Sequence, residues 1–133
     1  MTHVLGRNEV LYLENNNSNN SILNSIKKLL GLTEEQTDFD MDITIHINTT
    51  LTILNELGVG PEEGFLIEDS SATWDEYITD CRKFDKIKTY VYLKVRLYFD
   101  PPQNASLKEA MEKQAAELEW RLNASAENQE GSE

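Results

Sequence analysis

The chain has 133 residues, of which 39% are hydrophobic and 27% charged, so it is long enough for one domain and too short for two ordinary ones. It carries 24 Asp and Glu against 12 Lys and Arg, which gives a formal net charge of -12 at pH 7. A protein that grips DNA through its phosphates needs the opposite balance. These values favour one packed domain and exclude a protein that holds DNA by its charge.

Residues 1–20 are predicted to form a polar arm in front of that domain. Residues 14–20 (ENNNSNN) contain only Glu, Asn and Ser, a composition that buries little and favours turns or disorder. Residues 10–13 (VLYL) are apolar enough to pair as a strand or to dock on a neighbour. The domain itself is expected to begin at Ser21.

The first helix is predicted to start at Ser21, which can act as its N-cap, and to stop at Gly31. Its apolar face would carry Ile22, Ile26, Leu29 and Leu30.

A second helix is predicted from Phe39 to Glu56, because apolar residues recur there at helical spacing: Phe39, Ile43, Ile47, Leu51 and Leu54. The alternation of Ile43, Ile45 and Ile47 with polar residues would also fit a strand, but the helical pattern is much longer. Gly58 is expected to end this helix.

The next stretch is predicted to hold a loop, an extended piece and a short helix. Residues 58–64 are rich in Gly and Pro, and residues 65–67 (FLI) follow as a short extended segment. Thr73 can then cap a short helix that carries Trp74, Tyr77 and Ile78.

The strongest apolar pattern covers residues 84–99, which are predicted to form the central and most buried helix. Asp100-Pro101-Pro102 should end it, since proline excludes the preceding residue from the helical region. Ser106 and Glu109 fit a capping box that opens a last helix. Its inner face would hold Leu107, Met111, Ala115, Leu118 and Leu122, with Lys108–Glu112 and Lys113–Glu117 pairs outside.

Together these elements predict a mainly α fold, a compact bundle of four to five helices with a short extended segment and flexible termini. The expected organisation is a polar arm over residues 1–20, a helical domain over residues 21–123 and an acidic C-terminal tail over residues 124–133.

Charge is distributed unevenly along the chain. No Lys or Arg lies between Lys28 and Arg82, a stretch that contains thirteen acidic residues. From Arg82 to Arg96 six basic residues stand against Asp85 alone, a local sum of +5. Such asymmetry can steer association between copies, acidic flank to basic flank, although two separately solvated faces would give the same pattern.

Short motifs for metal or nucleotide chemistry are incomplete. Asp38, Asp40 and Asp42 have the spacing of the first calcium-loop ligands, but Ile43 stands where the loop needs Gly and Thr49 where it needs Glu. Carboxylates near a helix N-terminus explain this cluster more simply. Gly58, Gly60 and Gly64 also lack the dinucleotide-binding spacing.

Other candidate catalytic groups are equally isolated. His3 and His46 have no partner at metal-ligand spacing, and Cys81 is the only cysteine, so it is expected to be a buried thiol. We predict no catalytic residue, no cofactor and no metal. No apolar run approaches the roughly 20 residues of a membrane span, so no membrane association is expected either.

The two tryptophans have different expected roles. Trp74 is expected in the core, which is the usual place for an aromatic residue at helical spacing. Trp120 lies two positions from both Leu118 and Leu122 of the inner face, so it should point elsewhere and is a candidate for a partner surface.

Several segments resemble the head-to-tail connector, or adaptor, proteins of long-tailed bacteriophages and related prophages. The similar segments are residues 25–32 (SIKKLLGL), 54–65 (LNELGVGPEEGF), 72–74 (ATW), 87–102 (IKTYVYLKVRLYFDPP) and 117–123 (ELEWRLN). The resemblance extends over residues 21–123 and leaves out the N-terminal arm.

This resemblance implies a structural virion protein at the neck of the capsid portal vertex, made in the bacterial host cytoplasm. The chain would form a ring of about twelve copies that binds the portal protein, meets neck or tail-terminator proteins and extends the channel through which double-stranded DNA passes. The inter-helix loop and the chain ends carry contacts between rings in this family. That implies an assembly interface at Phe65, Leu66, Ile67, Trp120, Arg121 and Leu122.

In that setting the charges gain an expected role. An acidic channel lining would let DNA slide, whereas a basic lining would bind each phosphate. The candidate channel or subunit-contact charges are Asp38, Asp40, Asp42, Arg82, Lys83 and Lys86. The alternative from another class is a small acidic regulatory or inhibitor protein that mimics nucleic acid on a basic partner, which the net charge alone would favour.

Overall fold

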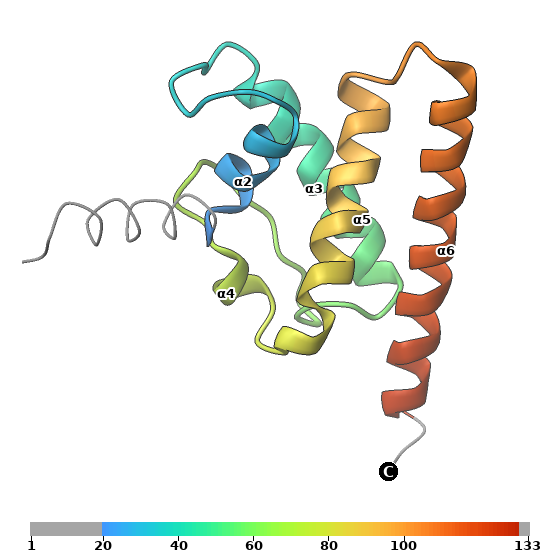
Figure 1. Ribbon diagram of the computed structural model, residues 1–133. Coiled ribbons are helices and arrows are strands. Elements are labelled where there is room, and N and C mark those ends of the chain that lie inside the picture. The colour runs from blue at the N-terminus through green and yellow to red at the C-terminus, as the bar shows by residue number, and fades with distance from the viewer. Residues whose placement is uncertain (1–19, 131–133) are drawn as a thin grey trace, which may run out of the picture.

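The structure is a computed structural model that describes residues 20–130, and these residues form five helices packed together without a β-sheet (Figure 1). The helices are α2 (Ile22–Leu29), α3 (Asp40–Glu56), α4 (Trp74–Tyr77), α5 (Cys81–Phe99) and α6 (Ala105–Glu130). Helix α5 packs against α2, α3 and α6. The prediction of a mainly α bundle with α5 at its centre is confirmed.

Helix α2 follows the sequence signals closely. The Ser21 hydroxyl accepts a hydrogen bond from the Asn24 amide at 3.2 Å, as an N-cap does. Ile22 and Ile26 are fully buried, and Gly31 follows the helix with φ +86°, a conformation that favours glycine. The predicted start and stop of this helix are confirmed.

Helix α3 decides between the two patterns seen in its sequence. Ile43, Ile47 and Leu54 are fully buried, whereas Ile45, which the strand alternative would place with Ile43, is exposed. Only helical spacing produces that difference, so the helix is confirmed. Phe39 is the N-cap and lies half-exposed against Phe99 at the end of α5, with ring centroids 5.4 Å apart.

Helix α4 has the predicted cap and carries the buried tryptophan. The Thr73 hydroxyl accepts from the Glu76 amide, and the Glu76 carboxylate accepts from the Thr73 amide, which completes a capping box. Trp74 is buried and its indole N–H donates to the Ser25 hydroxyl at 2.8 Å. The prediction that Trp74 belongs to the core is confirmed.

Helix α5 is central, but the prediction that it is the most buried helix is wrong, because five of the eight residues of α2 are buried. Ile87, Tyr90, Val91 and Val95 are all fully buried. The helix begins at Cys81, earlier than the predicted Phe84, because Asp80 caps it by accepting a hydrogen bond from the Arg82 amide at 3.0 Å. The side chain of Cys81 lies outside the described residues, so its expected burial stays a prediction.

Helix α6 differs from the prediction at its start. It begins at Ala105, and Asn104 caps it by accepting from the Leu107 amide at 3.1 Å, so the capping box at Ser106 is wrong. Leu107 is half-exposed instead of buried, because it lies in the first turn. Asn104 and Ser106 are both good N-caps by type, and the chain uses the earlier one.

The outer face and the end of α6 also differ from the prediction. The observed pairs are Glu109–Lys113 at 3.3 Å and Glu117–Arg121 at 2.8 Å, which place the acid N-terminal to the base, the favoured order. The helix continues to Glu130, so its predicted end at Asn123 is wrong. The extension is explained by packing of Ala126, which is buried close to Gly58. A Cβ added at Gly58 would lie 3.1 Å from the methyl group of Ala126.

The loop between α3 and α4 is tied to α3 by one amide side chain. The Asn48 side chain accepts from the Ile67 amide at 2.8 Å and donates to the Ile67 carbonyl at 2.9 Å. Residues 65–67 are therefore held against α3 without a strand partner, and the single β-bridge of residues 20–130 joins Ser21 to Thr73.

A buried ion pair links α2 to α3 and has no counterpart in the predictions. The Lys27 side chain is 1% exposed, its Nζ lies 2.8 Å from Oδ1 of Asp40, and it also donates to the Glu34 carbonyl at 3.2 Å. A buried ammonium group needs such partners, because burying it unpaired costs roughly several kcal/mol in lost hydration. Asp40 therefore holds the α2–α3 connection closed.

Replacing Asp40 tests this role. Asp40→Asn leaves the buried ammonium without its counter-charge and should lower the free energy of unfolding by about 2 kcal/mol, between the values for exposed and buried pairs. Asp42→Asn is the matched control, because Asp42 is an exposed carboxylate in the same first turn and should cost less than about 1 kcal/mol. Urea denaturation followed by circular dichroism measures both, and equal losses would contradict the assignment.

Candidate assembly surface

The residues expected to form the assembly interface divide into buried and exposed members. Ile67 and Leu122 belong to the hydrophobic core, and Phe65 is half-buried against Tyr77, with ring centroids 5.1 Å apart. Leu66 is 63% exposed, and Trp120 is 71% exposed. Only the exposed members can offer apolar area to another chain without unfolding the domain.

Trp120 lies on the outer side of α6, as its spacing predicts. It is the most exposed aromatic side chain among residues 20–130. Its neighbour Arg121 is held to Glu117 of the same helix by two hydrogen bonds, at 2.8 and 3.1 Å. A large exposed indole beside an oriented guanidinium is the composition found at interface hot spots.

Leu66 sits on a separate part of the surface, in the loop before α4. Together with Phe65 it lines a pocket of about 470 Å³ against Leu51 and Asn55 of α3. The next residue, Ile67, is hydrogen-bonded to Asn48 of α3, so the loop that carries the Leu66 side chain is attached to that helix.

The acidic candidates lie at the start of α3. Asp38 and Asp42 are exposed, whereas Asp40 turns inward to Lys27. Asp38 and Asp42, with exposed Glu35 in the preceding loop, form what we call the acidic end.

The basic candidates Arg82, Lys83 and Lys86 lie at the other end of the α3–α5 pair. Lys83 and Ile87 line a pocket with Gly58 and Val59, which follow α3, so the start of α5 lies beside the end of α3. Arg82 is already paired with Asp80 through its Nε at 3.2 Å, and this pairing lowers the pKa of the Asp80 carboxyl. The structure therefore does not bring the acidic and basic candidates together within one chain.

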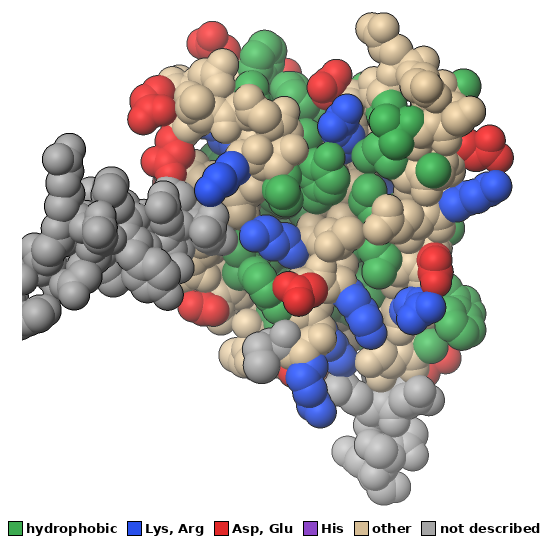
Figure 2. All heavy atoms as spheres, in the orientation of Figure 1, with side chains coloured by type: hydrophobic (Ala, Val, Ile, Leu, Met, Phe, Trp, Pro, Cys, Tyr) green, Lys and Arg blue, Asp and Glu red, His purple; other side chains and the backbone are tan. Residues whose placement is uncertain are grey.

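A second group of cations was missed by the sequence analysis. Lys88 in the middle of α5 lies near enough to Lys28 of α2 for the two charges to interact. Partial burial lowers the pKa of Lys88, the charge of Asp85 opposes this, and the charge of Lys28 adds a smaller lowering. We call Lys28 and Lys88 the basic patch, and Figure 2 shows Lys and Arg side chains spread over the face that α2, α5 and α6 present.

Sequence spacing could not reveal this patch, because Lys28 and Lys88 belong to different helices and come near each other only when α2 packs on α5. Other cations of α5 contact their own helix. Lys94 lies over the Tyr98 ring at 5.1 Å, and Arg96 donates to the Asp100 carbonyl at 3.1 Å. The Lys88 ammonium likewise lies 5.7 Å from the centroid of the Phe84 ring.

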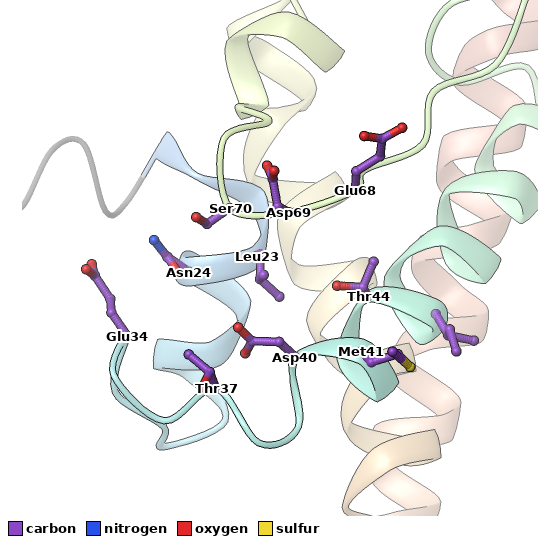
Figure 3. Close-up of a pocket in the computed structure, with 11 residues that line it drawn as sticks. Leu23, Asn24, Glu34, Thr37, Asp40, Met41, Thr44, Glu68, Asp69 and Ser70 are labelled. Atoms are coloured by element: carbon purple, nitrogen blue, oxygen red, sulfur yellow. The ribbon is translucent and has the colours of Figure 1, made fainter.

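A pocket lies between α2, the first turns of α3 and the loop before α4 (Figure 3). Its volume is about 530 Å³. Leu23, Met41 and Ile45 supply apolar side chains, and the acids around it are Glu34, Asp40, Glu68 and Asp69. Hydrogen bonds from Ser71 to the Asp69 carboxylate lower the pKa of that carboxyl.

The described residues contain no candidate metal site. Within residues 20–130 no group of three or more His, Cys, Asp or Glu side chains is placed to hold a metal ion. His46 is half-buried at the bundle edge, where its ring stacks on Tyr98 with centroids 5.7 Å apart. No helix in this part of the chain is long and apolar enough to cross a membrane. His3 and the apolar run 10–13 lie outside the described residues.

Comparison with known proteins identifies the family. No curated protein sequence and no solved structure matches the chain. A family model described as phage connector protein matches residues 22–129, which include all five helices almost completely. This family is structural and indicates no enzyme activity. Since the match spans most of the chain, the protein belongs to the phage connector protein family.

Proposed function

We propose that the chain is a head-to-tail connector, or adaptor, which assembles as a ring of about twelve copies beneath the portal, extends the DNA channel and joins the capsid to the tail. Family membership supports a structural role in the virion. The observation that supports a ring is that one chain exposes charges of both signs, with the acidic end at the start of α3 and the basic patch on α2 and α5.

A ring requires a head-to-tail contact between two different surfaces of the same chain. Asp38 and Asp42 are exposed, and no ion pair joins either to a cation among residues 20–130. Lys28 is exposed and Lys88 partly buried, and no ion pair joins either to an acid among residues 20–130. Contact between the acidic end of one copy and the basic patch of the next would satisfy both.

The two exposed apolar residues of the expected assembly interface then serve contacts with other proteins. Leu66 and Trp120 belong to the loop before α4 and to α6, apart from both charged surfaces. Burying an exposed Trp or Leu supplies about 1.5–3 kcal/mol of favourable free energy. These two residues are our candidates for the contacts with the portal and with the neck or tail-terminator proteins.

The remaining acids suit a DNA channel that does not bind its cargo. Thirteen acids lie between Lys28 and Arg82, and most of their side chains are exposed. Cations along a channel would bind successive phosphates and release counterions, which creates a strong, salt-dependent hold. A lining of carboxylates avoids that hold, so the genome passes without specific contacts.

Reversing the charge of the basic patch tests the ring. Native mass spectrometry of the wild-type chain, alone or mixed with the portal, should show an assembly of about twelve copies. Lys28→Glu with Lys88→Glu should lower the assembled fraction at least tenfold, because the contact then joins like charges.

The matched control is Lys113→Glu, since Lys113 is an exposed cation of α6 outside the patch. It should assemble like the wild type. A wild-type chain that stays monomeric with the portal present and binds a basic enzyme instead would contradict the ring and support the nucleic-acid mimic.

Alanine substitutions test the apolar contacts. Leu66→Ala and Trp120→Ala should each weaken binding to the portal or to the next neck protein by at least tenfold, as measured by co-sedimentation of assembled rings. Because both side chains are exposed, the thermal unfolding midpoint should change little. Leu122→Ala is the comparison, since it removes a core side chain and should lower that midpoint. Unchanged co-sedimentation of both surface variants would refute this interface.

A further inference from the structure

We propose that residues 10–13 (VLYL) of the N-terminal arm dock into the pocket between α2, α3 and the loop before α4 of their own chain. The pocket is large and open, it is partly apolar, and the arm joins the domain at its edge. This inference concerns the single chain and does not depend on the ring.

The pocket has an apolar floor that the described residues leave uncovered. Met41 is 77% exposed and Ile45 is 55% exposed, although both lie on α3, which contributes four residues to the hydrophobic core. With Leu23 they line a volume of about 530 Å³, within the range of roughly 300–1,000 Å³ that is usual for binding clefts. An extended segment with alternating side chains could place its apolar residues there.

The arm enters the domain at the edge of this pocket. The Ser21 hydroxyl donates to the Ser70 carbonyl at 2.7 Å, and the Ile22 amide donates to the Ala72 carbonyl at 3.0 Å. Ser70 itself lines the pocket, as do Leu23 and Asn24 immediately after the entry point (Figure 3). The place from which residues 1–19 depart is thus fixed beside the pocket.

The length of the connecting segment suits this docking. Residues 14–20 separate Leu13 from Ser21. Seven residues span at most about 25 Å when extended, and a flexible segment of that length keeps its ends within a shorter distance on average. A ligand tethered so closely has a high effective concentration at the pocket, which favours the arm of the same chain over that of another copy.

Composition selects residues 10–13 within the arm. They form the longest apolar run among residues 1–20 and lie between Glu9 and Glu14. The pocket has apolar side chains from Leu23, Met41 and Ile45 and is bordered by Glu68 and Asp69. Apolar contact, and not charge, is therefore what would hold the segment there.

Cysteine cross-linking of the full chain tests the docking. Leu11→Cys is combined with Met41→Cys in a Cys81→Ser background, and in a second protein with Trp120→Cys, a matched exposed position on α6. Disulfides need Cα atoms within about 7 Å, so mild oxidation should give an intrachain cross-link to position 41 at least tenfold faster than to position 120. Non-reducing electrophoresis separates cross-linked monomers from dimers.

A second pair of variants shows whether apolar contacts drive the docking. Val10→Asn with Leu13→Asn should reduce the rate at position 41 to that at position 120. Val4→Asn with Leu5→Asn, the other apolar pair of the arm, should leave it unchanged. Equal rates at positions 41 and 120 would overturn the proposal. Cross-linking to position 41 that appears only in dimers would also overturn it, because the occupant would then be the arm of a second copy.

Discussion

The structure depends above all on the burial of α5. Ile87, Tyr90, Val91 and Val95 lie on one side of this helix and are fully buried against neighbouring helices. Removing such side chains from water supplies about 1.5–3 kcal/mol each, the dominant favourable contribution in a domain of this size. The Tyr90 hydroxyl also donates a hydrogen bond to Glu119 of α6 at 2.9 Å. Burial raises the pKa of this phenol, and the hydrogen bond to Glu119 raises it further by a smaller amount. The charged residues of α5, from Arg82 to Arg96, lie off this buried side and are partly or fully exposed.

The elements that the sequence predicted well are those whose signals are local. Ser21 and Gly31 mark the ends of α2, and Thr73 with Glu76 forms the predicted cap of α4, because each signal needs only residues a few positions apart. The ends of α6 were less predictable. Asn104 and Ser106 are both good caps by type, and the last turns are stabilised by packing near Gly58, far away in sequence.

Long-range contacts also explain what was missed in the candidate site. The Lys27–Asp40 pair turns one of three similar aspartates inward, and nothing in their spacing distinguishes Asp40 from Asp38 or Asp42. The basic patch unites Lys28 with Lys88 across two helices. In contrast, the exposure of Trp120 followed from its position relative to the inner face of its own helix. Periodicity places a side chain on a face, but the identity of its partner depends on how the helices pack.

The fold and the charges together give a consistent physical account of a connector. A bundle centred on α5 exposes charges of both signs, and it leaves most acids between Lys28 and Arg82 in solvent. Complementary surfaces favour contact between copies, while the remaining acids discourage contact with DNA phosphates. The net charge of -12 is therefore compatible with a protein that surrounds DNA without holding it.

The most direct measurement of this account is an electron cryomicroscopy map of the chain assembled on its portal. We expect a closed ring in which the basic patch contacts the acidic end of the adjacent copy, while the other acids of residues 33–80 face the central channel. A ring whose channel is lined by the cations of α5, with those acids turned outward, would contradict it.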